Sequence, residues 1–111
     1  MQAHHIIPEQ VWADNESFLN RIGLAGKRDA KENGVLMPDS PEKAKSMRRK
    51  LYHCGSHAMY SRKIEWELNT IEQKLDEGLI DKNQALTAVN RLQVREKLFL
   101  ITPSKTPMRL I

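Results

Sequence analysis

The chain has 111 residues, of which 40% are hydrophobic and 29% are charged, and its formal net charge is +4. This length fits a single domain, residues 1–111, with one modest core. No apolar run approaches the roughly 20 residues of a membrane-spanning helix, and the N-terminus lacks the basic head and apolar stretch of a signal peptide. The single cysteine excludes an internal disulfide framework.

The N-terminal quarter predicts a short strand followed by a helix. Residues 3–7 form the strand, and Pro8 stops it, because β-branched residues favour extended structure and the residue before a proline avoids the helix. Residues 9–22 carry apolar side chains at spacings of 3, 4 and 7, which indicate a helix that the following glycines end.

A second strand is predicted about thirty residues into the chain. The turn dipeptide Asn33-Gly34 precedes Val35–Met37, a short apolar run that a proline stops. Residues 38–47 follow as a polar loop with room for one helical turn. The first half of the chain therefore reads as strand, helix, turn, strand and loop.

The second half is predicted to be helical, which gives a mostly helical α+β fold class. An apolar stripe at steps of 3 and 4 covers residues 60–75, with Ser56 as the helix cap and Gly78 as its end. A second helix over residues 82–101 begins after Asp81, which has a glutamine three residues later as in a capping box.

Positive charge is concentrated in one window, residues 43–63, which holds seven basic and no acidic residues. Residues 1–42 have an excess of acids, and residues 64–111 are balanced. Such a window binds phosphate backbones by releasing counterions, without reading sequence. It is equally compatible with a solvated loop that keeps the protein soluble.

Four histidines occur in two close pairs, His4-His5 and His53 with His57. In a helix, the second pair would lie on one face with Cβ atoms about 5–6 Å apart, which suits a shared metal ion; the glycine between them allows an irregular turn instead. Adjacent residues on a strand point to opposite sides, so the first pair divides into one ligand and one separate role. Cys54 could join the second pair in a structural zinc site, although such sites usually have four ligands with two or more cysteines.

Three motifs in order resemble the AHH family of the HNH/endonuclease VII nuclease superfamily: A-H-H-I-I-P at 3–8, N-G-V-L-M-P at 33–38 and H-C-G-S-H-A-M-Y at 53–60. The resemblance covers about residues 2–71, and the tail at 72–111 carries no recognisable motif. It implies a ββα-metal (His-Me finger) core of two short antiparallel strands and a helix around one divalent ion, with additional helices. The insert before the third motif is long, which leaves the register of the last two histidines open.

The resemblance also implies roles for particular side chains. The metal ligands would be His4, His53 and His57. The catalytic residues would be His5, as general base, and Asn33, whose amide ties its loop to the neighbouring strand and orients His5. Five basic residues would contact the nucleic acid: Arg48, Arg49, Lys50, Arg62 and Lys63.

The implied function is a metal-dependent endonuclease that hydrolyses phosphodiester bonds of DNA with little sequence specificity, using Mg²⁺, Mn²⁺, Ni²⁺ or Zn²⁺. RNA presents the same phosphates, so this alternative stays open. Such domains form the C-terminal toxins of secreted bacterial effectors, which act in the target-cell cytoplasm and are neutralised by an immunity protein, here expected to be acidic; no membrane partner is implied. The position of His4 near the first residue suggests that a delivery portion precedes the chain.

Two other functions are compatible with these residues. One is a non-enzymatic nucleic-acid or protein-binding module in which the histidines hold a structural zinc. The other is a helical interaction protein with incidental histidines. In each case Trp12 and Trp66 are expected to be core or interface anchors rather than platforms for base stacking. His5 and Asn33 discriminate the binding module from the nuclease, because a structural metal site needs neither. The interaction protein would be favoured by metal analysis that finds no bound ion, together with no rise in melting temperature on adding ions.

Overall fold

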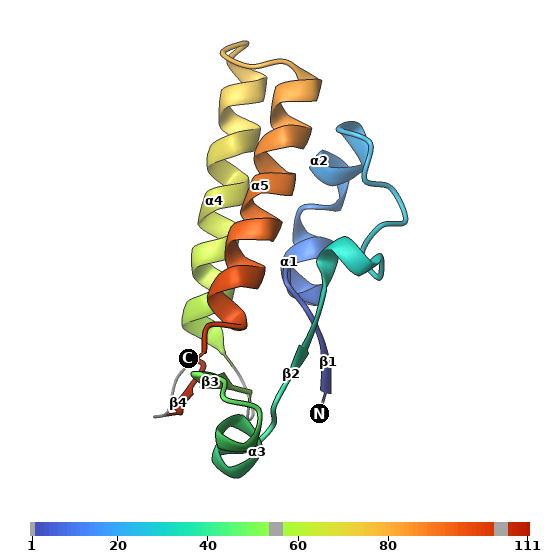
Figure 1. Ribbon diagram of the computed structural model, residues 1–111. Coiled ribbons are helices and arrows are strands. Elements are labelled where there is room, and N and C mark those ends of the chain that lie inside the picture. The colour runs from blue at the N-terminus through green and yellow to red at the C-terminus, as the bar shows by residue number, and fades with distance from the viewer. Residues whose placement is uncertain (1, 54–56, 104–106) are drawn as a thin grey trace.

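The computed structural model describes residues 2–53, 57–103 and 107–111, and its fold is mostly helical α+β, as predicted. In Figure 1, α1, α2, β1 and β2 lie on one side of a long helical hairpin, α3, β3 and β4 lie at its base, and both marked chain ends are near that base. The elements in chain order are β1 (Gln2–His5), α1 (Glu9–Asp14), α2 (Glu16–Arg21), the 3₁₀ turn η1 (Lys31–Asn33), β2 (Gly34–Met37), α3 (Pro41–Ser46), β3 (Leu51–Tyr52), α4 (Ala58–Asp76), α5 (Lys82–Leu100) and β4 (Met108–Arg109).

The two predicted strands pair antiparallel, with His4 opposite Val35 in β1 and β2. The first strand ends at residue 5 rather than at residue 7. Residues 6 and 7 do not continue the strand pairing, because Asn33 accepts the hydrogen bonds of their backbone. The N–H of Ile6 donates to the Asn33 carbonyl (2.8 Å), and the N–H of Ile7 donates to Asn33 Oδ1 (2.8 Å). The chain therefore turns away from β2 immediately after the histidine pair.

The single helix predicted over 9–22 is two short helices, α1 and α2, that meet at Asn15. The Asn15 side chain donates from Nδ2 to the Val11 carbonyl (2.8 Å), so it competes with the regular helical bonds of the backbone. The apolar spacing still identified the buried face correctly. Its five members all lie in the core: Val11, Trp12, Phe18, Leu19 and Ile22.

The insert before the third motif contains structure that the sequence only partly predicted. The expected helical turn is α3. Ser40 precedes it as the N-cap, and its side chain accepts a hydrogen bond from the Lys43 N–H at 3.2 Å. The strands β3 and β4 were not predicted. They are two residues each and pair parallel, with Leu51 opposite Met108, and runs of that length show no hydrophobic period.

The hairpin helices follow the predicted apolar stripes closely. The stripe on α4 is buried or half-buried, and left-handed Gly78 lies just beyond the end of that helix. The Asp81–Gln84 capping box is present at the start of α5, which ends at Leu100. The N-cap of α4 is His57; the predicted cap, Ser56, lies outside the described residues.

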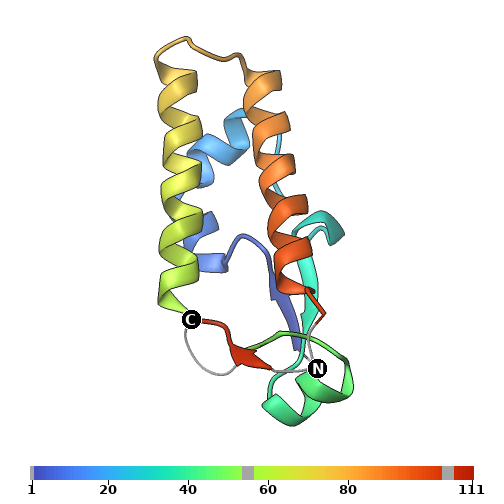
Figure 2. The ribbon, with the colours of Figure 1, turned by 60° about the vertical axis from the view of Figure 1, so that its left-hand side comes forward.

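The C-terminal helix is part of the same core as the N-terminal strands. Figure 2 shows β1 and β2 beside the lower half of α5, and buried residues of α5 such as Leu92 and Leu100 belong to one cluster with Ile6 and Ile7. Trp66, predicted as a core or interface anchor, is 68% exposed and so is not a core residue. Among the described residues, no helix is long and apolar enough to cross a bilayer.

Candidate active site

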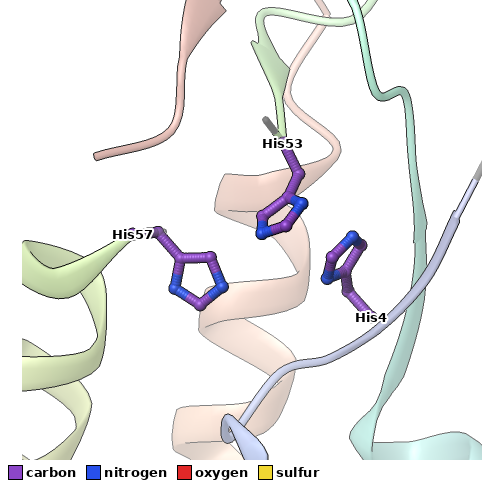
Figure 3. Close-up of side chains that lie close together, drawn as sticks. All are labelled: His4, His53 and His57. Carbon is purple, nitrogen blue, oxygen red and sulfur yellow. The ribbon is translucent and has the colours of Figure 1, made fainter. Parts of the chain in front are cut away.

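Three histidines from distant parts of the chain converge at the lower end of the fold (Figure 3). His4 belongs to β1, His53 follows β3 directly, and His57 is the residue before α4. The ring centroids of His4 and His53 are 3.8 Å apart, those of His53 and His57 are 4.8 Å apart, and those of His4 and His57 are 6.4 Å apart. One ring nitrogen from each histidine lies within 4.8 Å of the other two, so the three can face one ion.

Each of these histidines is placed by a contact of its own. The β1–β2 ladder holds His4, and the N–H of His53 donates to the Pro38 carbonyl (2.8 Å) at the end of β2. His53 is not helical, so the helical spacing considered for the second histidine pair does not apply. His57 Nδ1 lies 3.3 Å from the Ser61 hydroxyl, one turn into α4. Cys54, considered as a zinc ligand, lies outside the described residues.

The electrostatics of this cluster favour neutral imidazoles at His4 and His53. Burial, followed by repulsion from the other two imidazoles, lowers the pKa of His4 to about 4. The pKa of His53 is also lowered, first by burial and then by His57 and Arg109. Neutral imidazoles keep the lone pairs that a metal ion requires, so these two histidines can bind an ion without first losing a proton.

The donor set fits a divalent ion. Metal–nitrogen distances of about 2.1 Å in a tetrahedral site place the ligand atoms about 3.4 Å apart, so a small inward movement from the observed spread closes the site. Three imidazoles leave further coordination positions for water or phosphate oxygen. Structural zinc sites instead use four protein ligands, and the described residues bring three together.

His5 has entirely different neighbours from His4. Its Nε2 lies 2.7 Å from Asp29 Oδ1, and its Nδ1 lies 3.7 Å from Glu9 Oε1. Because a carboxylate only accepts hydrogen bonds, the contact with Asp29 places the proton of the neutral ring on Nε2 and leaves a lone pair on Nδ1. Asp29 was missed by sequence reasoning, because it lies in a polar stretch that reads as an ordinary loop.

Asn33 is fully buried and ties the turn after β1 to the loop before β2. Besides accepting from the Ile7 N–H, its amide donates to the carbonyls of Ile7 (3.2 Å) and Arg28 (2.9 Å). Gln93 of α5, itself buried, donates to Asn33 Oδ1 at 3.3 Å. These bonds hold the backbone that follows His5 rather than its ring, and the contribution from Gln93 had no signal in the sequence.

Tyr60 adds a second support for the same turn. Its hydroxyl donates to the Ile6 carbonyl at 2.7 Å, and its ring stands edge-on to His57 with centroids 5.7 Å apart. Burial raises the pKa of the Tyr60 phenol, so it remains a neutral donor. The residue belongs to the third motif, and its contacts connect the start of α4 to the end of β1.

The basic residues of the 43–63 window differ in whether another group of the protein already binds them. Lys63 is engaged by Glu96 at 2.9 Å, a carboxylate of α5 that is only 1% exposed. Arg49 donates to the Leu36 carbonyl at 3.1 Å. Four other basic residues of the window have no carboxylate partner among the residues that the structure describes: Lys45, Arg48, Lys50 and Arg62.

Comparison with known proteins agrees with this arrangement. Residues 1–95 match the model of AHH, described as a nuclease family of the HNH/ENDO VII superfamily with conserved AHH, and this range extends beyond the motifs into α5. Neither the curated proteins nor the solved structures contain a match to the chain. The A-H-H triplet stands here at residues 3–5, on β1. The chain therefore belongs to the AHH family of nucleases in the HNH/endonuclease VII superfamily.

Proposed function

We propose that this nuclease is a metal-dependent endonuclease that hydrolyses phosphodiester bonds of DNA with little sequence specificity. The observation that carries the proposal is the convergence of His4, His53 and His57 next to a fourth histidine whose neighbours are carboxylates. A cluster of neutral imidazoles and a separate imidazole with an oriented lone pair are the two parts that metal-assisted hydrolysis needs.

The three converging imidazoles would hold one divalent ion, which when bound supplies Lewis-acid stabilisation of the charge that develops on the phosphate oxygens. Nitrogen donors suit Zn²⁺, Ni²⁺ and Mn²⁺, whereas Mg²⁺ prefers oxygen and would need water and phosphate to complete its shell. The low pKa of His4 keeps its lone pair available at neutral pH.

His5 would act as the general base. Its Nδ1 takes a proton from water, the water oxygen forms a bond to phosphorus, and the bond from phosphorus to the leaving oxygen breaks, with that oxygen then taking up a proton. Asp29 fixes the tautomer by accepting from Nε2 and stabilises the imidazolium that forms. General-base assistance of this kind contributes roughly 10²- to 10⁴-fold to the rate.

Asn33 and Tyr60 would act as positioning residues. Together they bind three backbone groups of residues 6 and 7, immediately after the histidine pair. This fixes the direction of β1 and so the placement of His4 and His5 on its opposite sides.

Basic side chains around the end of α3 would contact the phosphate backbone: Arg48, Arg49 and Lys50, with Arg62 on α4. Phosphate contacts position a nucleic acid without reading its bases, which accounts for the low sequence specificity that we propose. Lys63 contributes less to this surface, because its charge is directed at buried Glu96.

For the biological role we infer a bacterial toxin domain, delivered to the cytoplasm of a competing cell and neutralised by an acidic immunity protein. The basic window supports such a partner, because complementary charge speeds association. Association of a co-purified acidic inhibitor, measured at two salt concentrations, tests this inference. An on-rate that does not fall with salt would contradict it.

The first experiment is plasmid nicking by the purified chain with Mg²⁺, Mn²⁺, Ni²⁺ or Zn²⁺, with EDTA, and with His5→Ala in parallel. Lys82→Ala, at the far end of the hairpin, is the control. We expect metal-dependent nicking that EDTA and His5→Ala abolish and that the control retains. No nicking of DNA, and none of RNA, by the folded protein with any of these ions would refute the proposal.

A further inference from the structure

A groove of about 430 Å³ lies where the start of α4, the end of α5 and the β3–β4 pair meet. No aspartate or glutamate lines it. Its walls combine three basic side chains with three exposed apolar ones: Lys50, Lys63, Arg109, Met59, Phe99 and Met108. Half of this lining comes from the C-terminal part of the chain, beyond the residues that match the family.

The groove borders the histidine cluster on one side. Tyr60 lines the groove and stands edge-on to His57, and Arg109 pairs in β4 with Tyr52, the residue before His53. Arg109 is also close enough to His53 to lower its pKa. A chain lying in the groove would therefore pass directly beside the proposed metal ligands.

Two of the three cations that line the groove form no ion pair among the described residues. Lys63 is bound by Glu96 at 2.9 Å and lies 5.3 Å above the ring centre of Phe99. In the described part of the chain, no carboxylate pairs with Lys50 or Arg109. The groove thus presents an anion-binding wall beside an apolar floor.

We propose that this groove binds a single nucleic-acid strand, with its phosphates on Lys50 and Arg109 and one base against Phe99 and Met108. The proposal deepens the nuclease function proposed above and rests on it. A polyanion with flat apolar rings matches both parts of the lining, because bases pack on aromatic side chains while basic groups follow the backbone. A base inside a duplex is stacked on its neighbours and cannot reach this floor, so the groove selects an unpaired nucleotide beside the cut.

The test is fluorescence anisotropy with a labelled single-stranded DNA oligonucleotide in EDTA, where no cleavage occurs, over a series of salt concentrations. We expect Lys50→Ala and Arg109→Ala each to weaken binding and to reduce the slope of log affinity against log salt by about 0.7, the value for one lost phosphate contact on a single strand. Lys82→Ala and Arg91→Ala, exposed basic residues elsewhere on α5, are matched controls that leave the slope unchanged.

The base contact is tested separately from the charge. We expect Phe99→Ala to weaken binding by at least about fivefold with no change in the salt slope. An oligonucleotide with abasic sites carries the same charge and no base, so wild type and Phe99→Ala should bind it equally. Thermal unfolding of every variant confirms that each one is folded.

Unchanged slopes for both Lys50→Ala and Arg109→Ala would overturn the proposal. It would also fall if a polyglutamate peptide of equal charge displaced the oligonucleotide at equal concentration, since the groove would then be a surface for an acidic protein. These results are independent of the nuclease assay. Specific binding without cleavage under any metal would refute the proposed function alone, and cleavage with normal binding by the groove variants would refute the groove alone.

Discussion

Two adjacent histidines on β1 have opposite surroundings. His4 faces two other imidazoles in a partly buried cluster that repels protons, whereas His5 faces the carboxylates of Asp29 and Glu9 on the outer side. A strand places neighbouring side chains on opposite faces, so one dipeptide serves two chemical environments. The difference shows how a very short motif can supply a metal ligand and a proton acceptor without bringing the two into conflict.

The sharpest test of this division compares His4→Ala with His5→Ala. Both variants should lose cleavage, and His5→Ala by about 10²- to 10⁴-fold. Only His4→Ala should weaken metal binding, as measured by calorimetric titration. We expect a loss of more than about tenfold, because removing a residue that merely supports a ligand already costs that much. A comparable loss of metal affinity in His5→Ala would show that the two faces are not separate.

The backbone turn that directs both faces depends on Asn33. Asn33→Ala leaves the buried N–H and carbonyl of Ile7 without their partner, so we expect the free energy of unfolding to fall by about 3 kcal/mol in urea denaturation. Asn90→Ala, on the exposed side of α5, is the control and should change it by less than about 0.5 kcal/mol. Equal stability of the two variants would contradict the role given to Asn33.

The outer face is tested by Asp29→Asn, which removes the charge beside His5 and keeps the size of the side chain. We expect the cleavage rate at saturating substrate to fall about tenfold, with an unchanged KM, because the imidazolium loses about 1.4 kcal/mol of stabilisation. Asp29→Glu should restore most of the rate. Asp14→Asn, an exposed aspartate at the end of α1, is the control, and an identical result for both aspartates would remove Asp29 from the mechanism.

A smaller effect is expected for Tyr60→Phe, which removes the hydroxyl bonded to the Ile6 carbonyl. The loss of one buried hydrogen bond should lower the free energy of unfolding by about 1 kcal/mol. Tyr52→Phe is the matched control, since the Tyr52 hydroxyl has no partner among the described residues. A difference within error between the two variants would mean that the tyrosine does not secure the turn.

A pH dependence of stability is expected on the inner face. His4 has a pKa of 6.5 when unfolded and about 4 when folded, so the unfolded chain binds more protons between these values. The metal-free protein should therefore be most stable above pH 6.5 and lose stability as the pH falls toward 4. Thermal unfolding should show this decline, and it should be flatter in His4→Ala; a Tm that rises on acidification would contradict the assignment.

The sequence predicted those parts of the site that depend on local pattern. The histidine pairs, Asn33 and the two strands are each marked by a turn dipeptide, a proline or a motif, and the structure brings His4, His53 and His57 together. The paired positions Tyr52 and Arg109 were not predicted, because two-residue strands have no period that a sequence reveals.

Hydrogen bonds of polar side chains account for the other differences between the predicted and the observed structure. Asp29 and Gln93 reach His5 and Asn33 across 24 and 60 residues, and nothing near either residue in the sequence distinguishes it from other polar positions. Asn15 divides a helix whose apolar spacing is continuous, because its side chain bonds to the backbone one turn earlier. The spacing of apolar residues indicates which positions are buried, but it does not indicate which polar side chain interrupts a helix.

The hydrogen bond from Gln93 to Asn33 has a consequence for when the histidine pair can be held in place during synthesis of the chain. Synthesis proceeds from the N-terminus, so the histidine pair leaves the ribosome before α5, which packs in one core with Ile6 and Ile7 and supports Asn33. A nascent chain that stops before α5 holds every motif residue and lacks the core that aligns them. The arrangement of His4 and His5 is therefore completed only after α5 has been synthesised and has packed against the N-terminal part of the chain.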